Sequence, residues 1–282
     1  MSYFTEALLA EEMNTVAVIK AYYGAIVTAL SGSGWTQTSD TGQVTISSIA
    51  STTPPFGYQM WQMNDTLQAT SPFFVRIYYS SSAGPYWQPQ IVVQVGIATD
   101  GAGNFTGLIQ SPPINLSLSS AGTAGNYCYY TGDTNRFAMA LTVGPVSSQQ
   151  VMFGIERTKS SSGTDTSTGV MIFAYNSFGT KFSMMLPYAV APTTALAQWP
   201  AAFNLAQPTM ANGTYVGMAC PIPFNVQPYN PGYNFLLYNG SDWPYRTVQT
   251  ITIYGAPHNY VILTPGISPT NPVGPSVMMR YE

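Results

Sequence analysis

Charged residues are scarce in this chain. Only 7% of its 282 residues are Asp, Glu, Lys or Arg, compared with about 25% in ordinary soluble domains. The eight Lys and Arg residues form no basic run, and the formal net charge is −3. Because nucleic-acid binding depends on basic side chains that displace counterions from phosphates, we expect no nucleic-acid partner. A neutral, polar surface is typical of secreted β proteins and of surfaces that become buried in an assembly.

Cysteine and histidine are almost absent. The two cysteines, Cys128 and Cys220, lie far apart without metal-ligand spacing, and the sequence leaves open whether they pair. The single histidine, His258, follows Gly255 in a predicted turn, and no nucleophile-elbow sequence accompanies it. We therefore expect no metal site, no Ser-His-Asp triad, no cofactor and no enzymatic activity.

Long apolar runs are also missing. None approaches the roughly 20 residues of a membrane-spanning helix, so we expect no membrane partner. Met1–Phe4 begins no basic segment of the kind that opens a secretory signal peptide. A protein of this kind that acts outside the cell would leave it by another route, such as lysis together with a virion.

The sequence predicts a mainly β protein with one N-terminal helix. A helix is expected over Thr5–Leu30, because apolar residues recur there every three or four positions, Thr5 can cap it and Ser31–Gly34 can end it. Short strand-like runs separated by Gly and Pro follow, which favours antiparallel sandwich or barrel-like layers. We divide the chain into a helix at 1–33 and a β-rich domain at 34–282, with a weak boundary near 187, where proline becomes frequent.

The clearest strand signals lie between residues 56 and 107. Tyr58–Met63 and Phe73–Tyr79 alternate, and Gln90–Gly96 is apolar and β-branched. Asp100–Asn104 supplies residues that suit a sharp turn. A hairpin or strand pair around Asp40–Gly42 is expected within 35–49. Further strands are expected at 126–131, 136–143, 151–158, 169–175, 181–186, 215–219, 234–238, 247–254, 259–263 and 277–281.

Several carboxylates are candidates for a glycosidase-like pair. Glu156 and Arg157 are neighbours in a strand and should point to opposite faces, so the one that faces inward needs a partner. A structural ion pair is the simpler interpretation. The loop at 100–104 resembles an oxygen-rich calcium loop but lacks the acids of an EF-hand, so we interpret it as a turn. The candidate carboxylates are Asp65, Asp100, Asp133, Glu156, Asp165 and Asp242.

Aromatic residues are abundant enough to form a sugar-binding surface, since aromatic faces stack on the apolar faces of sugar rings. Packing in the core is the alternative for each of them, and a host-surface glycan stays open as a partner. The polar loop at 159–168 is expected to be exposed. The candidate aromatic residues are Trp61, Trp87, Trp199, Trp243, Tyr127, Tyr129 and Tyr130.

Six segments together resemble a poorly characterised family of tailed-bacteriophage virion structural proteins. They are Gly34–Gly42, Tyr58–Asp65, Ser71–Ile77, Val95–Gly107, Phe153–Thr158 and Met279–Glu282. The resemblance implies a virion protein that is made in the bacterial cytoplasm, released by lysis and assembled in several copies with other virion proteins, with no catalytic residues to carry over. The tail or baseplate is our first choice of location. A head decoration protein and a receptor- or glycan-binding tail protein are the alternatives.

Overall fold

The predicted fold class is confirmed. A computed structural model describes residues 5–9, 15–81, 89–116, 126–143, 150–159, 164–176, 181–187, 235–238, 247–253, 255–263 and 276–280. These residues form antiparallel sheets and one α-helix, α1 (Val16–Gly32), and none of the described sheets closes into a barrel. A 3-10 turn spans Ile46–Ser48.

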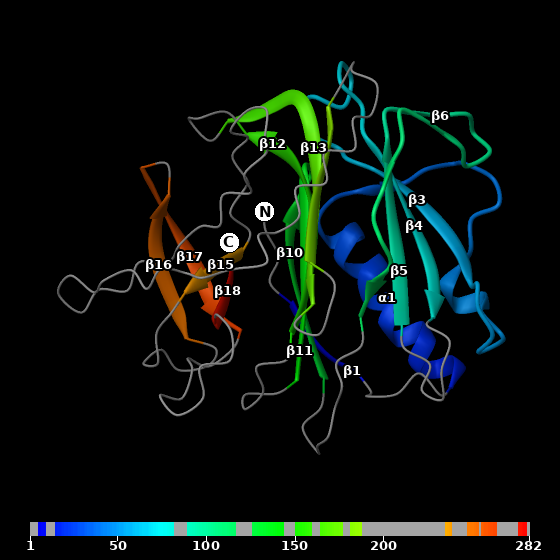
Figure 1. Ribbon diagram of the computed structural model, residues 1–282, viewed down its shortest axis with the longest axis horizontal. Coiled ribbons are helices and arrows are strands. Elements are labelled where there is room, and N and C mark those ends of the chain that lie inside the picture. The colour runs from blue at the N-terminus through cyan, green and yellow to red at the C-terminus, as the bar shows by residue number, and fades with distance from the viewer. Residues whose placement is uncertain are drawn as a thin grey trace.

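Three sheets carry the fold (Figure 1). The N-terminal sheet has the order β2 (Thr36–Gln37), β3 (Gly57–Gln62), β4 (Phe74–Ser81), β5 (Pro89–Gly96) and β8 (Ile109–Gln110), with β9 (Ile114–Asn115) also paired to β5. The central sheet has the order β1 (Thr5–Leu9), β10 (Asn126–Asp133), β11 (Arg136–Val143), β12 (Gln150–Lys159), β13 (Asp165–Asn176) and β14 (Lys181–Pro187). The C-terminal sheet has the order β15 (Phe235–Tyr238), β18 (Ser276–Arg280), β17 (Ala256–Ile262) and β16 (Val248–Ile253), and a small hairpin joins β6 (Ala98–Thr99) to β7 (Phe105–Thr106).

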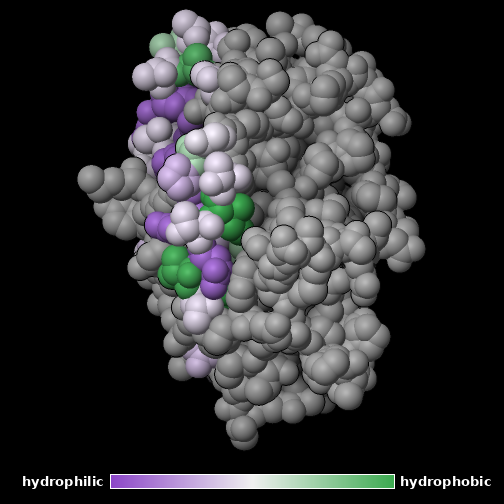
Figure 2. Space-filling view, turned by 90° about the vertical axis from the view of Figure 1, so that its left-hand side faces the viewer, coloured by the Kyte–Doolittle hydropathy of each residue, from purple (hydrophilic) through white to green (hydrophobic). Residues whose placement is uncertain are grey.

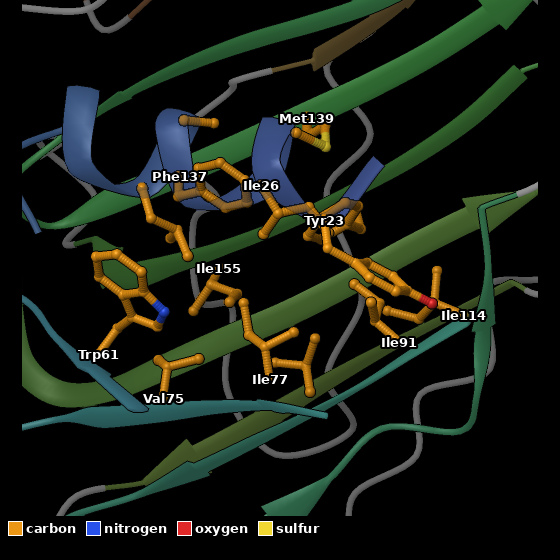
Figure 3. Packing of buried hydrophobic residues seen from close by; sticks show 14 of the residues in the cluster. Tyr23, Ile26, Trp61, Val75, Ile77, Ile91, Ile114, Phe137, Met139 and Ile155 are labelled. Atoms are coloured by element: carbon orange, nitrogen blue, oxygen red, sulfur yellow. The ribbon is translucent and has the colours of Figure 1, made fainter. Parts of the chain in front are cut away.

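The central sheet is the middle layer, and each of its faces packs on a different neighbour. The larger core lies between it, α1 and the N-terminal sheet, where Tyr23 and Ile26 of the helix meet Ile77 of β4 and Phe137 of β11 (Figure 3). A smaller core on the opposite face joins residues of β10 to β12 to residues of the C-terminal sheet. Burial of both faces explains why β11 and β12 read as nearly continuous apolar runs.

The predicted start of the helix is wrong. The helix begins at Val16, and Thr15 caps it by accepting a hydrogen bond from the Val18 N–H at 3.3 Å. Thr5–Leu9 instead forms β1, which pairs antiparallel with β10 from Thr5↔Tyr130 to Leu9↔Asn126. Apolar spacing alone cannot distinguish a helix from a strand at Thr5–Leu9, because the strand state depends on β10, which lies more than a hundred residues away in the sequence.

The predicted hairpin over 35–49 is also wrong. Thr36 and Gln37 pair with β3 rather than with a strand of their own segment. The side chain of Gln43 donates hydrogen bonds to the carbonyl oxygens of Thr38 at 2.8 Å and Asp40 at 2.9 Å. These local side-chain bonds compete with a strand ladder, and the N–H groups of Thr38 and Val44 bond to carbonyl oxygens of β3 instead of within the segment.

The other predicted strands that the structure describes lie within about four residues of their expected bounds. The short strands β6 to β9 were not predicted, and the loop expected at 159–168 is shorter than predicted, because β12 extends to Lys159 and β13 begins at Asp165. The strand expected at 215–219 lies outside the described residues. The boundary suggested near 187 coincides with the end of β14 and stays a prediction. No described helix has the length and apolar character needed to cross a membrane.

Candidate functional site: three arginine junctions

Arg76 joins the outer face of the N-terminal sheet to the β6–β7 hairpin. It lies on β4 opposite Gln94 of β5, and its Nε donates to the Gln94 side-chain oxygen at 2.6 Å. Its Nη1 donates to the carbonyl oxygen of Gly103 in the hairpin loop. The guanidinium also lies over the rings of Tyr58 and Tyr78, at 5.4 and 4.7 Å from their centroids. These contacts fix a half-buried cation in one position, as cation–π geometry favours.

The carboxylate of Asp100 is hydrogen-bonded within its own loop, residues 100–104. Asp100 accepts hydrogen bonds from the N–H groups of Ala102 at 2.8 Å and Asn104 at 3.0 Å, and from the Asn104 side chain at 2.7 Å. These bonds, the Asn104 side chain first among them, lower the pKa of Asp100. With its oxygens engaged in this way, the loop has the geometry of an Asx-type turn.

A second loop is tied to the same hairpin through Asp40. The Gly103 N–H donates to the Asp40 carboxylate at 3.2 Å, and the Thr41 N–H donates to the carbonyl oxygen of Gly101 at 2.9 Å. The Tyr58 hydroxyl donates to the carbonyl oxygen of Thr41 at 2.7 Å. Burial raises the pKa of Asp40, but hydrogen bonds from two threonine hydroxyls and the Gly103 N–H outweigh it and lower the pKa below its usual value.

Arg157 joins the central sheet to the loop that follows β3. Its side chain is fully buried and binds both oxygens of Asp65, with 2.9 Å between Nη2 and Oδ1. The guanidinium lies 5.0 Å from the centroid of the Phe73 ring, and Nη2 is 3.5 Å from the side-chain oxygen of Gln68. The prediction of a structural ion pair is confirmed for Arg157, since two-point Arg–carboxylate geometry is specific and strong.

Asn64, next to Asp65, strengthens the same junction. Its N–H donates to the carbonyl oxygen of Thr134 at 2.9 Å, and its side-chain amide donates to the carbonyl oxygen of Gly34 and the hydroxyl of Thr36, both at 2.6 Å. Residues 64 and 65 thus connect β2, the β10–β11 turn and β12. The sequence singled out Asp65 only as a possible acid, because nothing local links it to a partner 92 residues away.

A third junction lies on the other face of the central sheet. Arg136 of β11 is directly opposite Glu156 of β12, both are buried, and Arg136 pairs with Asp133 at 2.8 Å. Burial lowers the pKa of Arg136, while the carboxylate of Asp133 opposes that change. Glu156 and Arg157 therefore face opposite sides, as predicted, but both are buried because both faces of the sheet are covered, so the expectation that only one faces inward is wrong. Arg136 faces the same side as the alanines that pack against the C-terminal sheet.

His258 lies in strand β17, so the predicted turn is wrong at this residue. Gly255, with φ of 76°, makes the turn, and the strand begins directly after it. His258 Nδ1 lies 2.8 Å from Arg280 Nη2. Because a guanidinium can only donate, Nδ1 is the acceptor in this contact.

The candidate aromatic residues that the structure describes do not form an exposed platform. Trp61, Tyr129 and Tyr130 are buried, and Tyr127 is half-buried beside Tyr129, with 6.4 Å between the ring centroids. They pack in the cores, which was the alternative interpretation. Trp87, Trp199, Trp243, Asp242 and Cys220 lie outside the described residues.

Three of the candidate carboxylates have structural partners. Asp65 is held by Arg157 and Asp133 by Arg136, and Asp100 is held within its own turn. The backbone of Asp165 pairs with Lys159. Within the described ranges, His, Cys, Asp and Glu form no group of three or more that could hold a metal ion. Cys128 is a buried free thiol, and burial raises its pKa to about 12.

Comparisons of the chain with protein-family models, with curated proteins and with solved structures find no match.

Proposed function

We propose that this protein is a structural component of a tailed-bacteriophage virion, placed in the tail or baseplate and assembled in several copies with other virion proteins. It would be made in the bacterial cytoplasm and released by lysis. The proposal rests on the sequence resemblance and on the neutral, amide- and hydroxyl-rich composition. In this role the chain acts through protein–protein contacts and carries out no reaction.

The observation that carries the proposal is the position of the residues on which the resemblance rests. Five of the six similar segments meet in the fold at the Arg76 and Arg157 junctions. Asp40, Tyr58 and Gly103 meet around Arg76, and Asp65 and Phe73 meet around Arg157. These residues bind loops to sheets and one sheet to another, through their side chains and, at Gly103, through the backbone N–H and C=O groups. Such residues are expected of a building block whose shape is its function, whereas an enzyme needs carboxylates or nucleophiles that face a substrate.

Mass spectrometry of purified particles, followed by gold-labelled antibody microscopy, tests the proposal. We expect the protein in intact particles and label on the tail or baseplate. Label on the capsid would instead favour a head decoration protein. Absence of the protein from purified particles would refute a virion role.

Binding of a host glycan is the remaining alternative from the sequence. With Trp61, Tyr129 and Tyr130 buried, it depends on Trp87, Trp199 and Trp243. A glycan array probed with the wild-type protein and with Trp→Ala variants at these three positions would test it.

A further inference from the structure

Strand β16 ends the C-terminal sheet with an edge that is unusually well suited to pairing. Among the described residues β17 is its only neighbour in the sheet. Natural edge strands are usually protected by charge, proline or a bulge. Val248–Ile253 (VQTITI) contains no charged residue and no proline, and its register with β17 is unbroken.

The exposed side chains of β16 are small and apolar or hydroxylated. Val248 is 47% exposed, and Thr250 and Thr252 are exposed as well. The strand lies on the left of Figure 1, and Figure 2 shows that side of the molecule, where hydrophobic and hydrophilic residues alternate along the band of described residues. No like charges on this strand would oppose each other if a second copy approached.

The hydrogen bonds to β17 determine which backbone groups of β16 point outward. The Ile262 N–H donates to the carbonyl oxygen of Thr247 at 3.0 Å, so the pair Thr247↔Ile262 is hydrogen-bonded. Hydrogen-bonded and non-bonded pairs alternate in an antiparallel ladder. The N–H and C=O groups of Val248, Thr250 and Thr252 therefore point away from β17. Pro257, which has no N–H, lies opposite Thr252 at a non-bonded position, as this alternation requires.

We propose that two copies of this chain pair antiparallel through β16, with Thr250 opposite Thr250 of the second copy on a two-fold axis. A two-fold axis perpendicular to the sheet leaves the same face of both copies on the same side. Directly opposite residues then point to the same face, so the axis must pass between two copies of one residue and not between two successive residues. Centring on Thr250 places Val248 opposite Thr252 of the second copy. In this register each of the three outward-pointing residues lies opposite an outward-pointing residue of the second copy and exchanges both backbone hydrogen bonds with it. If the axis passed through Gln249 or Ile251 instead, only two of the three would lie opposite each other.

The side chains fit this register. It produces one Thr–Thr pair and two Val–Thr pairs on the exposed face, and cross-strand pairs of these types stabilise sheets. The two four-stranded sheets become one continuous sheet, and the contact closes on itself because both copies use the same surface. The contact gives the proposed multi-copy assembly a first interface, but it depends only on the chain itself and can be tested with purified protein.

Site-specific crosslinking tests the register. In a full-length Cys220→Ser background, Thr250→Cys should form a disulfide-linked dimer under mild oxidation, because directly opposite residues of a hydrogen-bonded pair have Cα atoms about 5.5 Å apart. Thr252→Cys should not, because the two Thr252 residues are offset by four positions, about 14 Å along the strand. Val248→Cys combined with Thr252→Cys should crosslink again.

Charge placed on the edge tests the interface itself. Sedimentation velocity of the wild-type protein should show a concentration-dependent dimer, and Thr250→Lys should abolish it by placing like charges opposite each other. Thr106→Lys, an exposed threonine on β7, adds the same charge elsewhere and should leave the dimer intact. Circular dichroism establishes that each variant is folded.

Equal crosslinking of folded Thr250→Cys and Thr252→Cys, or none in either, would overturn the inference. A wild-type protein that sediments as a monomer at all concentrations would do the same. Either result would leave the location of the protein in particles to be decided by labelling, so failure of the dimer and failure of the virion role are distinguishable.

Discussion

Replacing Asp65 by Ala should destabilise the protein far more than a surface substitution does. The Arg157 side chain is 0% exposed and that of Asp65 is 7% exposed. Without Asp65, the guanidinium keeps the Phe73 ring and a 3.5 Å contact to Gln68, neither of which carries a negative charge. Removing one partner of a buried ion pair costs about 3–5 kcal/mol. That is a large part of the roughly 5–15 kcal/mol by which domains are stable.

Urea unfolding, followed in parallel by circular dichroism and tryptophan fluorescence, measures this cost. Coincident transitions would show that one free energy of unfolding describes the process. Asp65→Asn keeps one acceptor oxygen and should lose about 1–3 kcal/mol. Asp100→Asn, at an exposed turn where Asn is also favoured, is the matched control and should stay within about 0.5 kcal/mol of the wild type.

A double-mutant cycle isolates the pair. Asp65→Leu with Arg157→Met removes both charges, and its free energy of unfolding should exceed that expected from the two single variants, since no buried charge is left unpaired. If Asp65→Ala unfolded within about 1 kcal/mol of the wild type, the reasoning on the Arg157 junction would be refuted.

Three further outcomes are expected. Gly103→Ala should be less stable than Gly101→Ala, because both glycines have positive φ but only at Gly103 would a Cβ collide with the Tyr58 ring; equal unfolding free energies would contradict this. Cys128 should resist a thiol reagent at pH 8 and react after unfolding, because burial keeps its pKa near 12 in the folded protein; fast labelling of the folded Cys220→Ser protein would contradict it. The dimer through β16 should be unchanged between about 0.05 and 0.5 M salt, because its contact contains no charge; a salt-dependent dissociation constant, measured by sedimentation, would point to another interface.

Strands with one buried face were predictable from the sequence. In β4, half-buried and buried residues alternate without exception from Phe74 to Ser81, and that period of two is what the sequence displays. The turn at Asp100–Asn104 was predictable as well, because its bonds are local. The start of α1 was not, because the competing state of Thr5–Leu9 depends on a distant strand.

The junctions were predictable only in part. The alternation of a strand requires Glu156 and Arg157 to face opposite sides, and that much is visible in the sequence. The choice of Asp65 as partner depends on how the loop after β3 meets β12, which no local pattern reports. Likewise, the contact of Arg76 with the rings of Tyr58 and Tyr78 follows from the register of β3 on β4, and register is a tertiary property.

The positions of the few charged residues show how the fold uses them. Arg76, Arg136 and Arg157, with Asp65 and Glu156, are half-buried or buried at contacts between loops and layers. Charges used inside the fold do not protect its edges, and β16 is left uncharged at the end of its sheet. An uncharged edge in a solitary protein is an aggregation liability. In a chain that assembles in copies it is a means of association, and a two-fold pair removes the liability because each edge is covered by its counterpart.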